Sequence, residues 1–212
     1  MGAPPLKVLC GIALLFGLFI YFSFSVNQQS IAETPGPSEE LKRAVTETLT
    51  ILDNPAIAPL EKRERVRKII LPLFDLERMA KLALGRHWKA NRSRMPEFVP
   101  LFSGILERAY LNFGMLKKAR GINIEFLSEK INEDNPDKAE VFTKVVTRKS
   151  EINVIYKLVR VGERWLIYDI SVENISLIAS YRAQFNEEIL TSSFDELLKK
   201  MREKLSQPEG NE

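Results

Sequence analysis

The sequence has few of the residues that catalytic and metal sites require. It contains one cysteine, Cys10, and one histidine, His87. A single histidine excludes a site with two histidine ligands, and a single cysteine excludes an internal disulfide. The seven glycines after residue 32 are dispersed, so there is no glycine-rich phosphate loop, and no serine lies in a nucleophile-elbow sequence. We therefore expect a protein that is not an enzyme and that needs no metal or other cofactor.

The remaining candidates for chemistry have simpler interpretations. His87 lies beside Trp88 in a short junction between predicted helices, which favours a structural role. Asp169 and Glu173 form a carboxylate pair that acid–base chemistry would need, but their position at the end of a predicted strand favours polar anchors. A lipid-modifying enzyme that uses His87, Asp169 and Glu173 stays open as an alternative.

Long apolar runs without charge are absent after residue 26, and the one at the N-terminus is typical of an export signal. Lys7 precedes the run from Val8 to Val26, and the small residues Ser30 and Ala32 form a cleavage motif. We expect residues 1–32 to be removed before Glu33, which places the rest of the chain in the periplasm. The run is also long enough to span a bilayer, so an uncleaved membrane anchor is the alternative.

The chain has no large excess of charge of either sign. Its net charge is +3, and loss of the signal with its single Lys7 lowers this to +2. This near-balance argues against a nucleic-acid partner. The basic clusters 62–68 and 117–120 are typical of a solvated helix face and a helix C-terminus. A docking patch for anionic lipid is the alternative interpretation of both clusters.

Helical periodicity predicts four helices in the first part of the chain, after a linker at 33–38. Ser38 is the expected N-cap of the first helix, which ends at 54–55, and Asp75 is the expected N-cap of the third, which ends at Gly85. Between them, a second helix at about 60–71 has basic residues outward. A fourth is predicted from 93 or 96 to about 119, with a wide apolar face and with a late start or a kink at Pro100.

The period changes from helical to alternating after residue 121. Four strands are predicted at 122–129, 139–148, 151–160 and 164–172, and their short turns indicate an antiparallel meander. Two helices at about 176–190 and 193–205 follow, then a polar tail at 206–212. The fold class is therefore α+β: N-terminal helices and a curved four-stranded sheet covered by the fourth helix and the helix after Ser176, in one domain at 39–205.

Apolar side chains on this sheet leave its interior open to two interpretations. One face is expected to carry two rows, at 152, 154, 156 and 158 on the third strand and at 166, 168, 170 and 172 on the fourth. Such a sheet either packs solidly against its helices or encloses an apolar pocket. Periodicity favours neither.

Four segments resemble the MlaC family of periplasmic phospholipid-binding proteins, also called the toluene-tolerance family. The strongest is Val172-Glu-Asn-Ile-Ser-Leu-Ile-Ala-Ser-Tyr-Arg-Ala-Gln-Phe185, and the others are 75–88, 97–110 and 165–169. The resemblance as a whole extends over about residues 39–204. Asn174 departs from the family pattern, which usually has glycine there. Because asparagine tolerates a left-handed backbone, a tight turn can survive the change.

The resemblance implies a monomeric periplasmic carrier with a cone-shaped fold, similar to nuclear transport factors, that holds phospholipid tails in an apolar cavity. Its implied partners are phospholipid, an inner-membrane ABC transporter with an MCE-domain subunit, and an outer-membrane lipoprotein complex. Such a pathway maintains the lipid asymmetry of the outer membrane. A carrier for hopanoid or another membrane lipid, and a membrane-anchored assembly factor without catalytic activity, are the alternatives.

We expect the cavity between the fourth helix and strands 152–172. The residues predicted to line the lipid tails are the apolar and aromatic ones on these elements: Phe102, Ile105, Tyr110, Val154, Tyr156, Leu158, Tyr168, Ile170 and Leu177. Ser176 is predicted to cap the helix that follows it. Arg182 and Gln184 are expected to be polar groups at the surface or beside a hinge.

Overall fold

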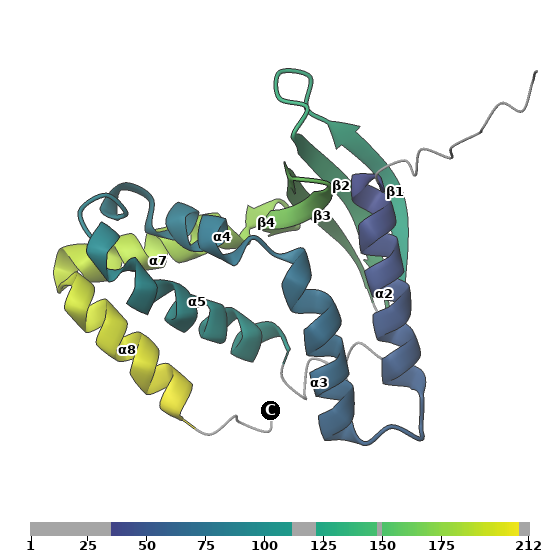
Figure 1. Ribbon diagram of the computed structural model, residues 1–212, viewed down its shortest axis with the longest axis horizontal. Helices are drawn as coiled ribbons and strands as arrows, with labels where there is room; N and C mark the ends of the chain where they lie inside the picture. The colour runs from purple at the N-terminus through teal and green to yellow at the C-terminus, as the bar shows by residue number, and fades with distance from the viewer. Residues whose placement is uncertain (1–34, 112–121, 148–149, 208–212) are drawn as a thin grey trace, which may run out of the picture. The chain divides into compact units, whose positions relative to one another are not determined.

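The computed structural model describes residues 35–111, 122–147 and 150–207, and in these residues it has six α-helices and a five-stranded antiparallel sheet (Figure 1). The helices are α2 (Pro37–Asp53), α3 (Pro59–Ile70), α4 (Leu76–Leu84), α5 (Met95–Tyr110), α7 (Leu177–Thr191) and α8 (Phe194–Ser206). The short 3-10 turns are η1 (Leu71–Leu73), η2 (Gly85–His87) and η3 (Arg92–Arg94). The strands are β1 (Asn123–Ile131), β2 (Lys138–Val146), β3 (Glu151–Val161), β4 (Arg164–Val172) and β5 (Ile175–Ser176).

Some predictions fall on parts of the chain that are not described. The export signal at 1–32, the basic cluster at 117–120 and the predicted fourth helix beyond Leu111 lie outside the described residues, as do 148–149 and 208–212. The description that follows concerns the compact unit that begins at Thr34.

Two helix starts agree with the predicted caps. The Asp75 carboxylate accepts a hydrogen bond from the Arg78 N–H at 2.9 Å, and α4 begins directly after it. The Ser176 hydroxyl accepts one from the Ala179 N–H at 3.0 Å at the start of α7. Each bond satisfies a backbone donor that the first helical turn leaves free. The predicted caps of these two helices are confirmed.

The start of α2 differs from the prediction. Gly36 is its N-cap and Pro37 its first residue, while the Glu39 carboxylate accepts a hydrogen bond from the Gly36 N–H at 3.1 Å. The Ser38 N–H instead donates to Glu129 on β1 at 3.1 Å. Because proline lacks an N–H and has a helical φ, it fits the first helical position. The prediction of Ser38 as the cap was therefore wrong, and α2 begins at Pro37, within the predicted linker.

The start of α5 also differs from the predicted late start at Pro100. The helix starts at Met95 and continues through Pro100 to Tyr110, so the late start was wrong. Pro100 has no N–H to donate, and the helix therefore lacks one backbone hydrogen bond at this position. The apolar side chains of the helix supply the burial that offsets this loss, since Phe98 and Phe102 are fully buried.

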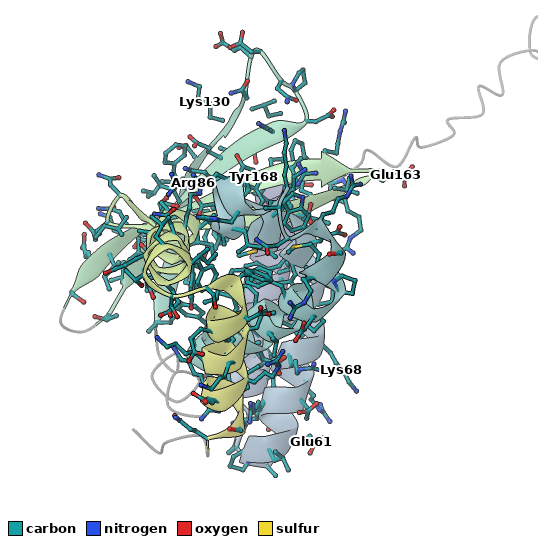
Figure 2. The ribbon with its side chains drawn as sticks, turned by 90° about the vertical axis from the view of Figure 1, so that its left-hand side faces the viewer. Glu61, Lys68, Arg86, Lys130, Glu163 and Tyr168 are labelled. Atoms are coloured by element: carbon teal, nitrogen blue, oxygen red, sulfur yellow. The ribbon has the colours of Figure 1, made fainter. Side chains whose placement is uncertain are left out.

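α3 has the amphipathic character that its sequence predicts. Val66 is buried, whereas Glu61 and Lys68 are exposed on the outer side of the helix (Figure 2). Arg65 and Glu61 form an ion pair at 2.5 Å along this face. The basic cluster on α3 is therefore largely a solvated helix face.

The sheet is a meander in which β1 to β5 lie side by side in chain order, but β4 contains an irregularity. Leu158 of β3 pairs with Ile167, whereas Tyr156 pairs with Ile170, so β4 has one additional residue between these pairs. Such a β-bulge reverses which side chains face the core. Ile167 and Ile170 thus share one face of the sheet. The predicted row of residues 166, 168, 170 and 172 on a single face was wrong.

The cover of the sheet also differs from the prediction. Leu41 and Ala44 of α2 pack with Leu73 of η1 against Val141, Leu158 and other residues of the sheet face. Figure 1 shows α2 against the sheet, while α4, α5, α7 and α8 gather beside the β4 end. These four helices form their own core, described below. The expectation that the fourth helix covers the sheet was therefore wrong.

The fifth strand was absent from the predicted meander. Val172 pairs with Ile175, and the two residues between them, Glu173 and Asn174, have φ values of 47° and 66°. Two central residues with positive φ are typical of a two-residue hairpin turn that matches the twist of the strands. Asn174 thus adopts the left-handed backbone that asparagine was expected to tolerate at this position. This turn brings the chain from β4 into α7.

Candidate functional site

A cavity of about 650 Å³ lies where the two groups of helices and the end of the sheet meet, and it is partly open to solvent. This volume is in the usual range of ligand pockets. Its wall is mostly apolar and combines α3, η1, α4, the C-terminal end of α5, β4, β5, α7 and α8. The lining residues are Ile70, Leu71, Phe74, Leu76, Met79, Leu106, Glu107, Tyr110, Leu111, Ile170, Val172, Glu173, Ile175, Leu177, Ser180, Tyr181, Gln184 and Lys204.

The exposure of these residues gives the cavity an inner end and a mouth. Met79 and Leu106 are buried. In contrast, Tyr110 is 46% exposed and Ile175 is 68% exposed, and Val172 is also exposed. The apolar interior is thus continuous with exposed apolar side chains at the mouth. This is the arrangement that a ligand with long apolar chains requires.

Three of the nine residues predicted to line lipid tails lie in the wall of this cavity: Tyr110, Ile170 and Leu177. Phe102 and Ile105 lie in the core of the four-helix group, against which Tyr168 packs. Leu158 is in the core between α2 and the sheet, with Tyr156 packed against it, and Val154 is also buried. The cavity therefore lies at the C-terminal end of α5 and of β4 rather than along all of β3.

The wall that comes from α3, η1 and α4 was not predicted from the sequence. Ile70, Leu71 and Phe74 flank Pro72, and this run of apolar residues is longer than one helix face needs. That excess was the available signal. Tyr181 was also missed, although it lies in the segment that resembles the MlaC family. Of the two polar residues expected near a hinge or surface, Gln184 lines the cavity, whereas Arg182 donates to the Leu82 carbonyl at 2.7 Å.

An ion pair joins two walls of the cavity. Arg67 Nε of α3 lies 2.6 Å from Glu107 Oε1 of α5. The hydrogen bond to Glu107 and its negative charge raise the pKa of Arg67 above its ordinary value. Leu111, directly after α5, packs with Leu52 and Val66 on the same side. These contacts hold the C-terminal end of α5 against α3.

Two tyrosines form a hydrogen-bonded pair in the cavity wall. The hydroxyls of Tyr181 and Tyr110 interact, and Tyr110, which is half-exposed, lies nearer the mouth. Burial and the interaction with Tyr110 raise the pKa of Tyr181 to about 12, and burial raises the pKa of Tyr110. The Tyr181 ring packs edge-on against Phe102, with ring centroids 5.3 Å apart. Both phenols are therefore neutral near pH 7.

Asp169 holds the start of α7 in place beside the cavity. Its buried carboxylate accepts hydrogen bonds from the Ser176 hydroxyl at 2.7 Å and the Ile178 N–H at 3.1 Å. Lys157 Nζ lies 3.5 Å away. A negative charge at a helix N-terminus is also favoured by the helix dipole. Asp169 is thus the polar anchor that its position at a strand end favoured.

Of the other two candidates for chemistry, Glu173 lines the cavity and His87 does not. His87 Nε2 lies 3.0 Å from the Asn186 side-chain oxygen, between η2 and α7. Among the described residues, no group of three or more histidine, cysteine or acidic side chains is arranged to hold a metal ion. In the same part of the chain, no helix has both the length and the apolar character needed to cross a bilayer.

Comparison with known proteins agrees with this architecture. The chain resembles the solved structure of a phospholipid-binding protein from Ralstonia solanacearum, in complex with a phospholipid, with a TM-score of 0.68 and 21% sequence identity. The match covers 82% of this chain and 100% of that one, and at this identity it shows a common fold. No curated protein matches the sequence. The family model described as MlaC protein matches residues 42–203, so the chain belongs to the MlaC family.

Proposed function

We propose that this protein is a periplasmic carrier that binds the acyl chains of a phospholipid in the cavity between α5, η1, α7 and the end of β4. The observation that carries the proposal is the apolar cavity of about 650 Å³ with exposed apolar residues at its mouth. Membership of the MlaC family supports it, as does a neighbour of the same fold that was solved with a phospholipid.

The physical reason for such a cavity is the free energy of a lipid tail in water. An acyl chain of about 16 carbons in water costs on the order of 10 kcal/mol, at ~0.8 kcal/mol per methylene. A protein that moves a lipid between membranes must replace the bilayer with apolar surface of its own. The side chains of Met79, Leu106 and Ile170 supply such a surface, and no covalent chemistry is needed.

The proposal extends to transport. In it, the protein receives lipid from one membrane complex and delivers it to another, with an outer-membrane lipoprotein complex and an inner-membrane ABC transporter with an MCE-domain subunit as partners. Cleavage of residues 1–32 would release the carrier into the periplasm. We also propose that the fold has a cone-like shape related to that of nuclear transport factors.

Native mass spectrometry of the purified chain tests lipid binding directly. The protein is incubated with vesicles of phosphatidylethanolamine and phosphatidylglycerol, separated from them, and analysed together with an extract of its bound lipid. We expect one or more phospholipids to leave the vesicles with the protein. Folded protein that carries no lipid from the producing cells and takes none from vesicles would contradict the proposal.

An intact-mass measurement tests release from the membrane. We expect the mature protein recovered from exporting cells to begin at Glu33. If residues 1–32 are retained, the protein is a membrane-anchored factor rather than a free carrier. Identification of the extracted lipid separately decides between phospholipid and hopanoid.

A further inference from the structure

The polar side chains that line the cavity divide into those with partners inside the protein and those without. Glu107 is paired with Arg67. The Glu173 carboxylate accepts a hydrogen bond from the Asn153 N–H, and the Ser180 hydroxyl donates to the Ser176 carbonyl at 2.8 Å. The hydrogen-bonding capacity of these three side chains is therefore already used in part by the fold.

Three other lining side chains keep free donors. Lys204 and Gln184 have no hydrogen bond or ion pair with any described residue. The Tyr110 hydroxyl has the Tyr181 hydroxyl as its one side-chain partner in the described part of the chain. Each phenol has one donor, so a hydrogen bond between the two uses one proton and leaves the pair one free donor, which is at Tyr110 when Tyr181 donates.

The position of these donors limits which ligand atoms they can meet. Tyr110 is half-exposed at the mouth, with the apolar interior of Met79 and Leu106 beyond it. A ligand that extends from the interior to solvent has its apolar part at Met79 and its first polar atoms near Tyr110. Free donors require acceptors, and a desolvated donor without an acceptor loses binding free energy.

We propose that Tyr110 recognises an ester carbonyl of the bound lipid, with the Tyr181 hydroxyl holding it in orientation. The inference rests on the proposed lipid-binding function and adds the part of the lipid that is recognised. The glycerol ester region offers carbonyl acceptors at the junction of tails and headgroup. Gln184 and Lys204 are then available to the adjacent phosphate oxygens. A hopanoid hydrocarbon lacks such esters, so this site selects a glycerol ester lipid.

The test compares two lipids that differ only at this acceptor. Dipalmitoyl phosphatidylethanolamine has two ester carbonyls, whereas its dihexadecyl ether analogue has none. Affinity of the full chain for each is measured by competition against a fluorescent phospholipid. Because one neutral hydrogen bond changes affinity by roughly threefold to tenfold, we expect a preference of this size for the ester lipid.

Variants assign the preference to a residue. Tyr110→Phe removes the donor and keeps the ring, so we expect it to bind both lipids equally, at the affinity that the wild type has for the ether lipid. Tyr181→Phe should reduce the preference in part. Tyr168→Phe is the matched control, because Tyr168 packs against the four-helix core and does not line the cavity. It should keep the full preference.

Each outcome has a separate meaning. If neither lipid binds the wild type, the proposed function itself fails. If the wild type binds ester and ether lipids equally, the carrier stands and recognition of the ester is wrong. If the wild type prefers the ester and folded Tyr110→Phe keeps that preference, Tyr110 is not the recognising residue and the inference is overturned.

Discussion

The two halves of α5 contain similar residues but have opposite surroundings. Near its middle, Phe102 is completely buried and packs against Phe98, Tyr181 and Phe185, whose ring centroids lie 5.3–5.9 Å from its own. Two turns later, Tyr110 lies at the mouth of a cavity. The apolar face of this one helix thus contributes to a packed core at one end and to the wall of a cavity at the other. The difference arises from the elements opposite, since α7 and α8 fill the space beside the first half, whereas α3 and η1 leave space beside the second.

The largest effect on stability should come from creating a cavity in the packed core around the first half of α5. Phe102→Ala removes a ring from a filled core, and we expect it to lower the free energy of unfolding by about 3–5 kcal/mol. Chemical denaturation followed by circular dichroism measures this change. Leu177→Ala, in the cavity wall, is the comparison and should cost much less because one side of Leu177 already faces space. Equal losses in the two variants would mean that the two halves are packed alike.

The next largest effect should come from filling the cavity beside the second half of α5, and it should lower lipid occupancy. Ile170→Trp adds volume on the face that lines the cavity, so lipid occupancy should fall by on the order of tenfold or more, equivalent to about 1.4 kcal/mol. Native mass spectrometry after incubation with vesicles measures the occupancy. Val161→Trp adds the same ring at an exposed position outside the cavity and should retain lipid. Unchanged occupancy in Ile170→Trp would place the lipid elsewhere.

The turn that leads from β4 to the cavity wall provides a smaller effect. Asn174 has a φ of 66°, a region that costs a β-branched residue roughly 1–2 kcal/mol. We expect Asn174→Val to lower the free energy of unfolding by about this amount, and Asn174→Gly to leave it unchanged or raise it. Thermal or chemical denaturation of both variants checks the order. A valine variant as stable as the glycine variant would exclude a left-handed backbone at this position.

The smallest effect should be the alkaline response of the tyrosine pair. The pKa of Tyr181 is raised to about 12, above the value of about 10 in an unfolded chain. Its stabilising contribution is therefore complete below pH ~10 and is lost as pH rises toward about 12. The free energy of unfolding should fall less over this range in Tyr181→Phe than in the wild type. The same variant should lack the latest-titrating tyrosinate in an absorbance titration, and parallel curves would contradict the assignment.

The sequence predicts the elements well because the signals for them are local. Helical and alternating periodicity each extend over many residues, and the capping side chains Asp75 and Ser176 lie next to the helices that they start. The MlaC resemblance adds the family, which the family model confirms. The described helices and the first four strands could therefore be placed to within a few residues, except that α5 ends at Tyr110 and not at about 119.

The arrangement of the elements depends on contacts between distant residues, and this is where prediction failed. Nothing in the alternation of β4 indicates an additional residue between Ile167 and Ile170. The packing of α2 on the sheet depends in part on Glu40, which accepts hydrogen bonds from Arg164 and the Trp165 N–H. The pairing of Arg67 with Glu107 spans 40 residues. The cavity wall from α3 and η1 follows from such contacts and could not be found from periodicity.

The bulge in β4 makes the length of this strand as important as its composition. If all residues of β4 were kept but paired regularly with β3, without the bulge, every side chain between the bulge and the turn at Glu173 would exchange faces. Asp169 and Ser171 would then point toward the cavity and Ile170 and Val172 away from it. A design that transplants or changes this strand must therefore keep the bulge and the number of residues as well as the residue types.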